Sequence, residues 1–259
     1  LVLSCLLITA AEADQCVAAD TPSLIAEAAC TAQQVRRDCH HVNSADCPIG
    51  VFDSGTGGMA VLEAILTIDA FRNATARVVH AGDGQADFAT ESFIYLADQA
   101  NMPYGNYPSV GRAAFLEALA VKDAEFLLGN RYFRHADSPP ALNKLPVKAI
   151  VIACNTATAY GKPHIEKLVE ATGLNIPVIG VVDAGARGAL DLFNDGQSGT
   201  IGVLATRATV LAKAYPRAIE AEIARRRLAE GKLQIGVVQQ GSLGMAGAID
   251  GVAEFIVPA

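Results

Sequence analysis

The fold is decided by the stretch Val147-Lys148-Ala149-Ile150-Val151-Ile152-Ala153, which is followed directly by Cys154-Asn155-Thr156. Apart from Lys148, its first part is continuously apolar and rich in β-branched side chains, a pattern typical of a strand buried on both faces of a parallel sheet. The spacing of apolar residues after Thr156 is helical as far as Gly173. The stretch therefore predicts a β–α unit whose strand ends in a cysteine.

The same order of strand and helix recurs on both sides of this stretch. Repeated β–α units imply an α/β fold, in which a parallel sheet carries flanking helices on both faces. We expect strands over 48–52, 93–97, 147–153, 177–182, 200–204 and 233–238, and helices after 58 and over 111–130, 156–173, 184–193 and 213–229.

Composition and charge exclude several classes of protein. The chain has 259 residues, of which 51% are hydrophobic and 18% charged, so it is neither a disordered chain nor a collagen-like fibre. Its net charge of -7 argues against a nucleic-acid-binding surface, because phosphate binding requires clustered Lys and Arg. The one dense basic run, Arg225-Arg226-Arg227, is interpreted as the solvated face of a helix.

Residues 1–13 are interpreted as a signal peptide. Leu1 to Ala10 form an apolar run that is too short to span a membrane, and Ala11-Glu12-Ala13 has the form of a signal-peptidase site. We therefore expect an exported, periplasmic protein with no membrane span in the mature chain. A buried N-terminal strand is the alternative.

Residues 14–47 are interpreted as a cysteine-rich leader. Cys16, Cys30, Cys39 and Cys47 predict two disulfides, whose pairing the sequence leaves open. The alternative is a metal site assisted by neighbouring histidines, but the cysteines lack the CxxC spacing of zinc sites, so we predict no metal site.

Polar or reactive residues follow three of the expected strands. They are Asp53-Ser54-Gly55, Pro103-Tyr104-Gly105 and Cys154-Asn155-Thr156. Because parallel strands present their carboxyl ends at one edge of the sheet, and ligands bind there, the three segments predict a common functional site.

Cys154 is expected to be a reactive thiol, because a helix N-terminus favours the thiolate and lowers the pKa. Inert burial in the core is the alternative. The glycines of the run from Asp53 to Gly58 let backbone amides approach a carboxylate. This run is neither a P-loop nor a GxGxxG fingerprint, so no nucleotide is expected. Helix capping is the alternative role for Asp53.

Four segments in a fixed order resemble the glutamate racemase family within the aspartate/glutamate racemase superfamily. The first three are Ile49 to Gly58, Tyr95 to Asp98 with Pro103-Tyr104-Gly105, and Val151 to Ala157. The fourth, Gly202 to Val210 together with Tyr215, is similar to the second domain of that family.

The resemblance implies two pseudo-symmetric α/β domains with the active site between them, over 48–184 and over 185–259, the second incomplete at its C-terminus. It implies a racemase that needs no cofactor, acts on glutamate or a related acidic amino acid, and leaves a homodimer open. One thiolate removes the α-proton and a second thiol returns one on the opposite face. Carried over by position, Cys154 and Asp53 are catalytic, and the substrate-binding residues are Ser54, Tyr104, Gly105, Asn155, Thr156 and Thr206.

The sequence departs from the family in three respects. No cysteine follows Cys154, so the family's second catalytic element, Cys-Thr-His, has no counterpart; a truncated chain or a one-thiol relative would explain this. Residues 71–92 and 132–145 are interpreted as insertions. The family acts in the cytoplasm on peptidoglycan precursors, whereas residues 1–13 predict export. Alternative functions are a one-thiol decarboxylase or isomerase of small dicarboxylic acids, and an exported binding protein for acidic amino acids.

Overall fold

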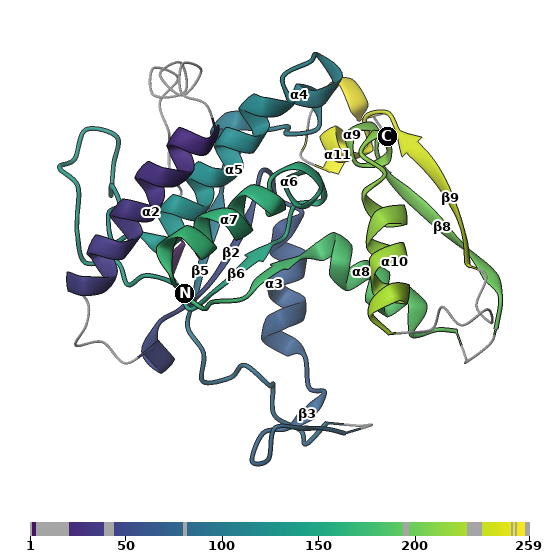
Figure 1. Ribbon diagram of the computed structural model, residues 1–259, viewed down its shortest axis with the longest axis horizontal. Helices are drawn as coiled ribbons and strands as arrows, with labels where there is room; N and C mark the ends of the chain where they lie inside the picture. Colours follow the sequence, from purple (N-terminus) through teal and green to yellow (C-terminus); the bar gives the residue numbers. More distant parts are fainter. Residues whose placement is uncertain are drawn as a thin grey trace.

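A parallel five-stranded sheet in the order β1-β5-β2-β6-β7 forms the centre of the larger unit (Figure 1). The computed structural model of the chain describes residues 2–3, 21–38, 44–79, 82–193, 197–226, 235–249, 251 and 253–256. The strands of this sheet are β1 (Val2–Leu3), β2 (Ile49–Asp53), β5 (Phe93–Ala97), β6 (Ala149–Ile152) and β7 (Val178–Gly180).

Helices separate the strands, as the sequence predicted. The helices of the larger unit are α2 (Thr21–Asp38), α3 (Gly58–Thr67), α4 (Asn106–Ser109), α5 (Ala113–Leu128), α6 (Asn155–Tyr160) and α7 (Lys162–Thr172), with short 3-10 turns η1 (Ser44–Asp46) and η2 (Gln99–Asn101).

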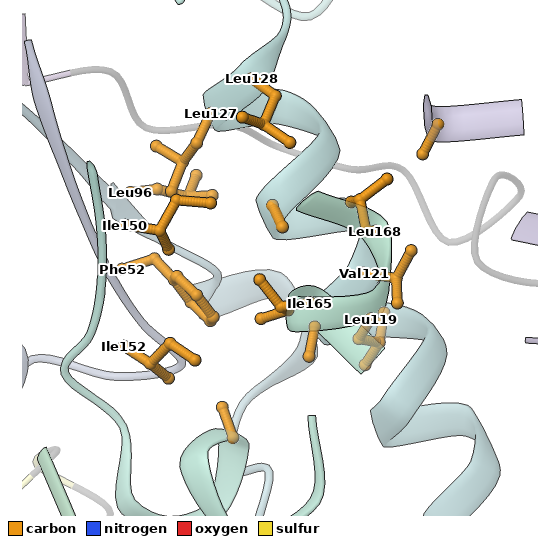
Figure 2. Close-up of a cluster of buried hydrophobic side chains, with 14 of the residues drawn as sticks. Phe52, Leu96, Leu119, Val121, Leu127, Leu128, Ile150, Ile152, Ile165 and Leu168 are labelled. Atoms are coloured by element: carbon orange, nitrogen blue, oxygen red, sulfur yellow. The ribbon is translucent and has the colours of Figure 1, made fainter. Parts of the chain in front are cut away.

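Strands β2 and β6 are buried on both faces of the sheet: successive side chains of a strand point to opposite faces, and an apolar cluster covers each face there. In β6, Ile150 and Ile152 join the cluster beneath α2, α5 and α7, whereas Val151 joins the cluster on the side of α3. Phe52 of β2 lies with Ile150 and Ile152 against α5 and α7 (Figure 2). The β-branched run of β6 thus has the doubly buried position that its sequence predicted.

The smaller unit holds two parallel strands in the part of the chain that the structure describes, β8 (Gly199–Thr206) and β9 (Ile235–Ser242). One face of this pair packs on α8 (Val181–Leu190) and α10 (Ala214–Arg225) through Ile201, Ile235 and Val237. On the other face Leu204 and Val238 are exposed. The remaining helices are α9 (Arg207–Leu211), α11 (Met245–Ile249) and the turn η3 (Ala253–Phe255).

Several boundaries differ from the prediction. The helix expected over 156–173 is two helices that meet at Gly161, where an added Cβ would lie 2.3 Å from Ala120 Cβ, so the glycine lets α5 approach closely. The strand expected over 177–182 ends at Gly180, because Val181 already begins α8. The pair β8 and β9 extends past the predicted strands, to Thr206 and Ser242.

The N-terminal region differs most from the prediction. Residues 21–38, expected within a cysteine-rich leader, form helix α2, which buries Leu24, Ala28 and Ala32 against α5 and α7. Cys30 is exposed on this helix and Cys47 is buried before β2; both are thiols, so the predicted pair of disulfides is not formed. Cys16 and Cys39 lie outside the described residues.

The start of the chain contributes to the sheet. Val2 and Leu3 pair in parallel with Ile94 and Tyr95 of β5, which agrees with the alternative of an N-terminal strand. The rest of the expected signal peptide lies outside the described residues, so export stays a prediction. None of the described helices is long and apolar enough to cross a membrane.

The first expected insertion contains a hairpin of β3 (Phe71–Arg72) and β4 (Arg77–Val78), which projects beyond α3 (Figure 1). Aspartate side chains accept hydrogen bonds from the backbone N–H groups of this loop: Asp69 from Asp83 and Gly84, and Asp87 from Ala70 and Phe71. The loop is therefore held by its own polar groups. The second insertion is closed by a bridge between Tyr132 and Ala141.

Leu168→Ala tests the core beneath α7. Leu168 is fully buried, so truncation should lower the free energy of unfolding by about 3 kcal/mol, through lost transfer energy and the cavity left behind. Leu192→Ala is the matched control, because Leu192 is 83% exposed and its loss should change stability by less than about 0.5 kcal/mol. Urea denaturation followed by circular dichroism measures both; equal effects would contradict the assigned core.

Candidate active site

The three polar segments meet at the carboxyl edge of the sheet. β2 lies between β5 and β6, and all three run in parallel, so Asp53, Ala97 and Ile152 end at the same edge. The structure thereby brings the segment after β2 next to Cys154, which follows β6. The shared site expected from the sequence has this physical basis.

Cys154 is the N-cap residue of α6. Its backbone is extended, and its Sγ accepts a hydrogen bond from the Ala157 N–H at 3.4 Å, the part that Ser or Asp oxygens usually take. The side chain is buried, and its sulfur lies 3.5 Å from Ser54 Oγ. The thiol is thus fixed in orientation by the helix start and by a hydroxyl from the neighbouring strand end.

Asp53 is held by backbone N–H groups at the end of β2. Its two carboxylate oxygens accept hydrogen bonds from Ser54 N at 2.8 Å and from Gly58 N at 2.7 Å. Burial raises the pKa of Asp53, and these N–H groups together with a hydrogen bond to Cys154 offset part of the rise. Asp53 therefore both caps the loop before α3 and contacts the thiol.

Position 58 has room only for a glycine. An added Cβ would lie 2.5 Å from Asp53 Cβ and 3.0 Å from Ala153 Cβ, closer than side-chain carbons pack. The glycine run therefore allows the N-terminus of α3 to press against the end of β2.

The pKa of the Cys154 thiol is higher than the sequence predicted. Burial, and next the charge of Asp53, raise the pKa of the Cys154 thiol to about 12, although the N–H groups of Ala157 and Ser54 act in the opposite direction. The helix N-terminus was expected to lower this pKa, but loss of water and a nearby carboxylate outweigh it. The resting group is a neutral thiol.

Residues from both units flank Gly105. An added Cβ at Gly105 would lie 3.9 Å from Thr206 Oγ1 and 4.0 Å from Thr156 Oγ1, so both hydroxyls lie near Gly105. Thr206 caps α9 by accepting a hydrogen bond from Thr209 N. The expected substrate-binding residues Gly105, Thr156 and Thr206 are thus brought together between the units.

Asn155 links the units by a side-chain contact. Its Oδ1 accepts a hydrogen bond from the hydroxyl of Tyr215, on α10, at 2.9 Å. Tyr215 occurs in the family-like segment but was not predicted as a site residue. Its position in the first turn of α10, shortly after Thr206, was the available signal.

The hydroxyl of Tyr104 contacts two carboxyl groups of the core. Its side chain is buried, and its hydroxyl contacts Asp98 Oδ2 at 2.6 Å and Asp123 Oδ2 at 2.8 Å. The contact of Tyr104 with substrate, which the resemblance implies, stays a prediction, and the hydroxyl is already bonded to these two carboxyl groups. Only its neighbour Gly105 reaches the threonines.

The groups around Cys154 differ from a cluster of metal ligands. Among the described residues, no group of three or more His, Cys, Asp or Glu side chains could hold a metal ion. The potential donors at Cys154 are instead hydroxyl, amide and backbone N–H groups, which suit a carboxylate.

Comparison with known proteins agrees with the geometry. The profile of the Asp/Glu/Hydantoin racemase family matches residues 134–258. A glutamate racemase from Limosilactobacillus fermentum is 34% identical over 215 residues, covering 80% of this chain and 61% of the relative. The chain belongs to the aspartate/glutamate racemase family. A glutamate racemase from Chlorobaculum tepidum is 35% identical and matches 70% of this chain and 50% of its own length.

A solved structure is similar to this racemase-family chain. It is that of a glutamate racemase isoform from Bacillus anthracis, with a TM-score of 0.51 and 25% identity, covering 82% of this chain and 61% of the other. The chain thus spans about three fifths of the length of these two proteins.

Gly58→Ala should disturb the end of β2. The added methyl group would force Asp53 or Ala153 to move, which should lower the free energy of unfolding by about 1–3 kcal/mol. Gly188→Ala, in α8, is the matched control, because an added Cβ meets nothing within 4 Å there and should stabilise the helix by up to about 1 kcal/mol. Denaturant midpoints decide; an unperturbed Gly58→Ala protein would contradict the close packing.

Alkylation with iodoacetamide tests the state of Cys154. Because its pKa is raised to about 12, the rate at pH 8 should be low and should rise with pH. Asp53→Asn removes a neighbouring negative charge, so the pKa should fall and the rate at pH 8 should increase severalfold. Peptide mass spectrometry separates Cys154 from the exposed Cys30, which serves as the internal control. A faster rate at Cys154 than at Cys30 in the unaltered protein would refute the neutral resting thiol.

Proposed function

We propose that this racemase-family chain binds glutamate between its two units and moves the α-proton, with Cys154 as one acid/base group of an L- and D-glutamate interconversion. The observation that carries the proposal is that a buried thiol, Cys154, lies near a buried carboxylate, Asp53, with the Ser54 hydroxyl 3.5 Å from the sulfur. The names of the relatives supply the substrate.

Neutral donors are suited to hold the substrate. Thr156, Thr206 and Asn155 present hydroxyl and amide groups beside Gly105 and Tyr215. Such donors bind a carboxylate, and when they are fixed in a water-poor site they stabilise the charge that develops as the α-proton leaves. No cofactor is required for this stabilisation.

The proton transfer begins with the neutral thiol. Asp53 lies close enough to Cys154 for its charge to raise the pKa of the thiol, and its carboxylate is the group that would take up the thiol proton. The resulting thiolate removes the α-proton of glutamate, and the electron pair of the broken C–H bond spreads into the α-carboxylate. The ammonium group of the substrate favours this step, because a cation beside the thiol lowers its pKa.

Racemisation needs a second proton donor on the opposite face of the α-carbon. The Cys-Thr-His element that the resemblance assigns to this role has no counterpart in the 259 residues. We therefore expect these residues to exchange the α-proton of one enantiomer and to invert it only when an opposite-face group is present.

Proton exchange in D2O tests the proposal. L-glutamate and D-glutamate are incubated separately with the protein, and deuterium at Cα is followed by NMR. We expect exchange with one enantiomer, reduced by about 10²–10⁴-fold in Cys154→Ala, which is the usual contribution of a general acid/base group. Cys30→Ala is the matched control and should leave the rate unchanged, because Cys30 is exposed on α2.

The outcomes separate the candidates. Exchange that survives in Cys154→Ala would remove the thiol from the mechanism. Carbon dioxide release from a small dicarboxylic acid, without exchange in glutamate, would favour the one-thiol decarboxylase. Glutamate binding by calorimetry without any turnover, and unchanged in Cys154→Ala, would favour an acidic amino-acid-binding protein.

A further inference from the structure

Three buried polar groups form a cluster that the proposed reaction does not use. The hydroxyl of Tyr104 lies between two carboxyl groups, at 2.6 Å from Asp98 Oδ2 and 2.8 Å from Asp123 Oδ2. Asp98 and Asp123 are each only 1% exposed. Two carboxylates this close in the core could not both keep a negative charge without a large cost.

If Asp98 and Asp123 were both ionised, the cluster would hold one proton too few for its two hydrogen bonds. The Tyr104 hydroxyl has one proton and can donate to one carboxyl group, and two acceptors cannot form a hydrogen bond with each other. The second short contact therefore requires a proton on one of the two acids.

Hydrogen-bond partners distinguish the two acids. Asp98 accepts bonds from Tyr104 and, at both of its oxygens, from Asn101 Nδ2, at 2.9 and 3.1 Å. Asp123 contacts Tyr104 through Oδ2, while its buried Oδ1 has no hydrogen-bond partner.

We propose that Asp123 is a positioning residue of the active site: its carboxyl group stays protonated, donates a hydrogen bond to Tyr104 Oη, and so fixes the turn that places Gly105 beside Thr156 and Thr206. The inference rests on the proposed function for which substrate the active site binds. The proton chain itself, from Asp123 through Tyr104 to Asp98, stands on the contacts alone.

The surroundings of Asp123 favour the protonated form. The titratable groups that act on it are Asp98, at the end of β5, Tyr104, in the turn, and Asp53, at the end of β2. Burial, and then the charge of Asp98, raise the pKa of Asp123 well above its usual range. On its own helix, Lys122 pairs with Glu125 at the surface.

The turn between Asp98 and Gly105 is tied to the site by further bonds. The Asp98 N–H donates to the Asp53 carbonyl at 2.9 Å, which joins the turn to the end of β2. The Tyr107 hydroxyl donates to the Asn101 carbonyl at 3.0 Å. Loss of the Asp123 proton donor would therefore loosen a segment whose end, Gly105, lies beside Thr156 and Thr206.

Infrared spectroscopy tests the proton directly and without substrate. At pH 7 the unaltered protein should show the carbonyl stretch of a protonated carboxylic acid, and Asp123→Asn should lose it. Glu125→Gln, on the same helix, is the matched control and should retain it. Absence of the band from the unaltered protein would overturn the proposal whether or not the chain exchanges protons in glutamate.

A second pair of variants tests the positioning role. Asp123→Asn keeps a donor of the same size and should leave glutamate binding within about twofold, whereas Asp123→Leu keeps the volume but removes the donor and should weaken it about tenfold. Calorimetry of glutamate binding measures both. Equal affinities for the Asn and Leu variants would overturn the positioning role while leaving Cys154 chemistry untouched.

The pH dependence of stability supplies a third readout. A proton held by folded Asp123 is released on unfolding above the ordinary pKa of aspartate, so the stability of the unaltered protein should fall as pH rises from 5 to 8. The Asn variant should show a smaller fall over that range. Identical slopes would mean that Asp123 is ionised in the folded protein.

Discussion

The hydrogen bonds that the Asp53 carboxylate accepts from Ser54 and Gly58 hold the part of the molecule on which the site depends. They close the loop after the central strand β2 and place a buried acid beside the thiol that follows β6. The same end of β2 accepts a bond from Asp98 and so fixes the third polar segment. The end of β2 therefore positions the ends of the two strands beside it, β5 and β6.

Most of the fold could be predicted, because a strand that is buried on both faces of a parallel sheet has a recognisable, continuously apolar sequence. Val147 to Ala153 could be assigned as a doubly buried strand from their side chains alone, and the polar residues after each strand marked the edge of the sheet. Helix α2 was missed because four cysteines suggested a disulfide-linked leader, whereas its apolar residues at helical spacing, Leu24, Ala28 and Ala32, predicted an amphipathic helix equally well.

The site was less predictable than the fold, because its electrostatics depend on tertiary burial. A cysteine before a helix has the same sequence whether water reaches it or not, so the rise in the pKa of Cys154 could not be inferred from its neighbours in the chain. Tyr104 likewise has its position in the turn fixed by sequence, but Asp123, which contacts its hydroxyl, comes from a helix 19 residues away. The contacts of both groups arise between elements.

The hairpin loop beyond α3 has a consequence for how this chain could vary. The carboxylates of Asp69, Asp83 and Asp87 bind backbone N–H groups of the same loop, and the Asp87 N–H donates to the Ile68 carbonyl at its base, at 2.8 Å. The polar groups of this loop form hydrogen bonds within the loop, and its two ends are joined at its base. The loop therefore depends little on contacts with the sheet. Its length can therefore drift between homologous chains at the modest entropic cost of a longer or shorter loop, without disturbing the strand ends where the chemistry lies.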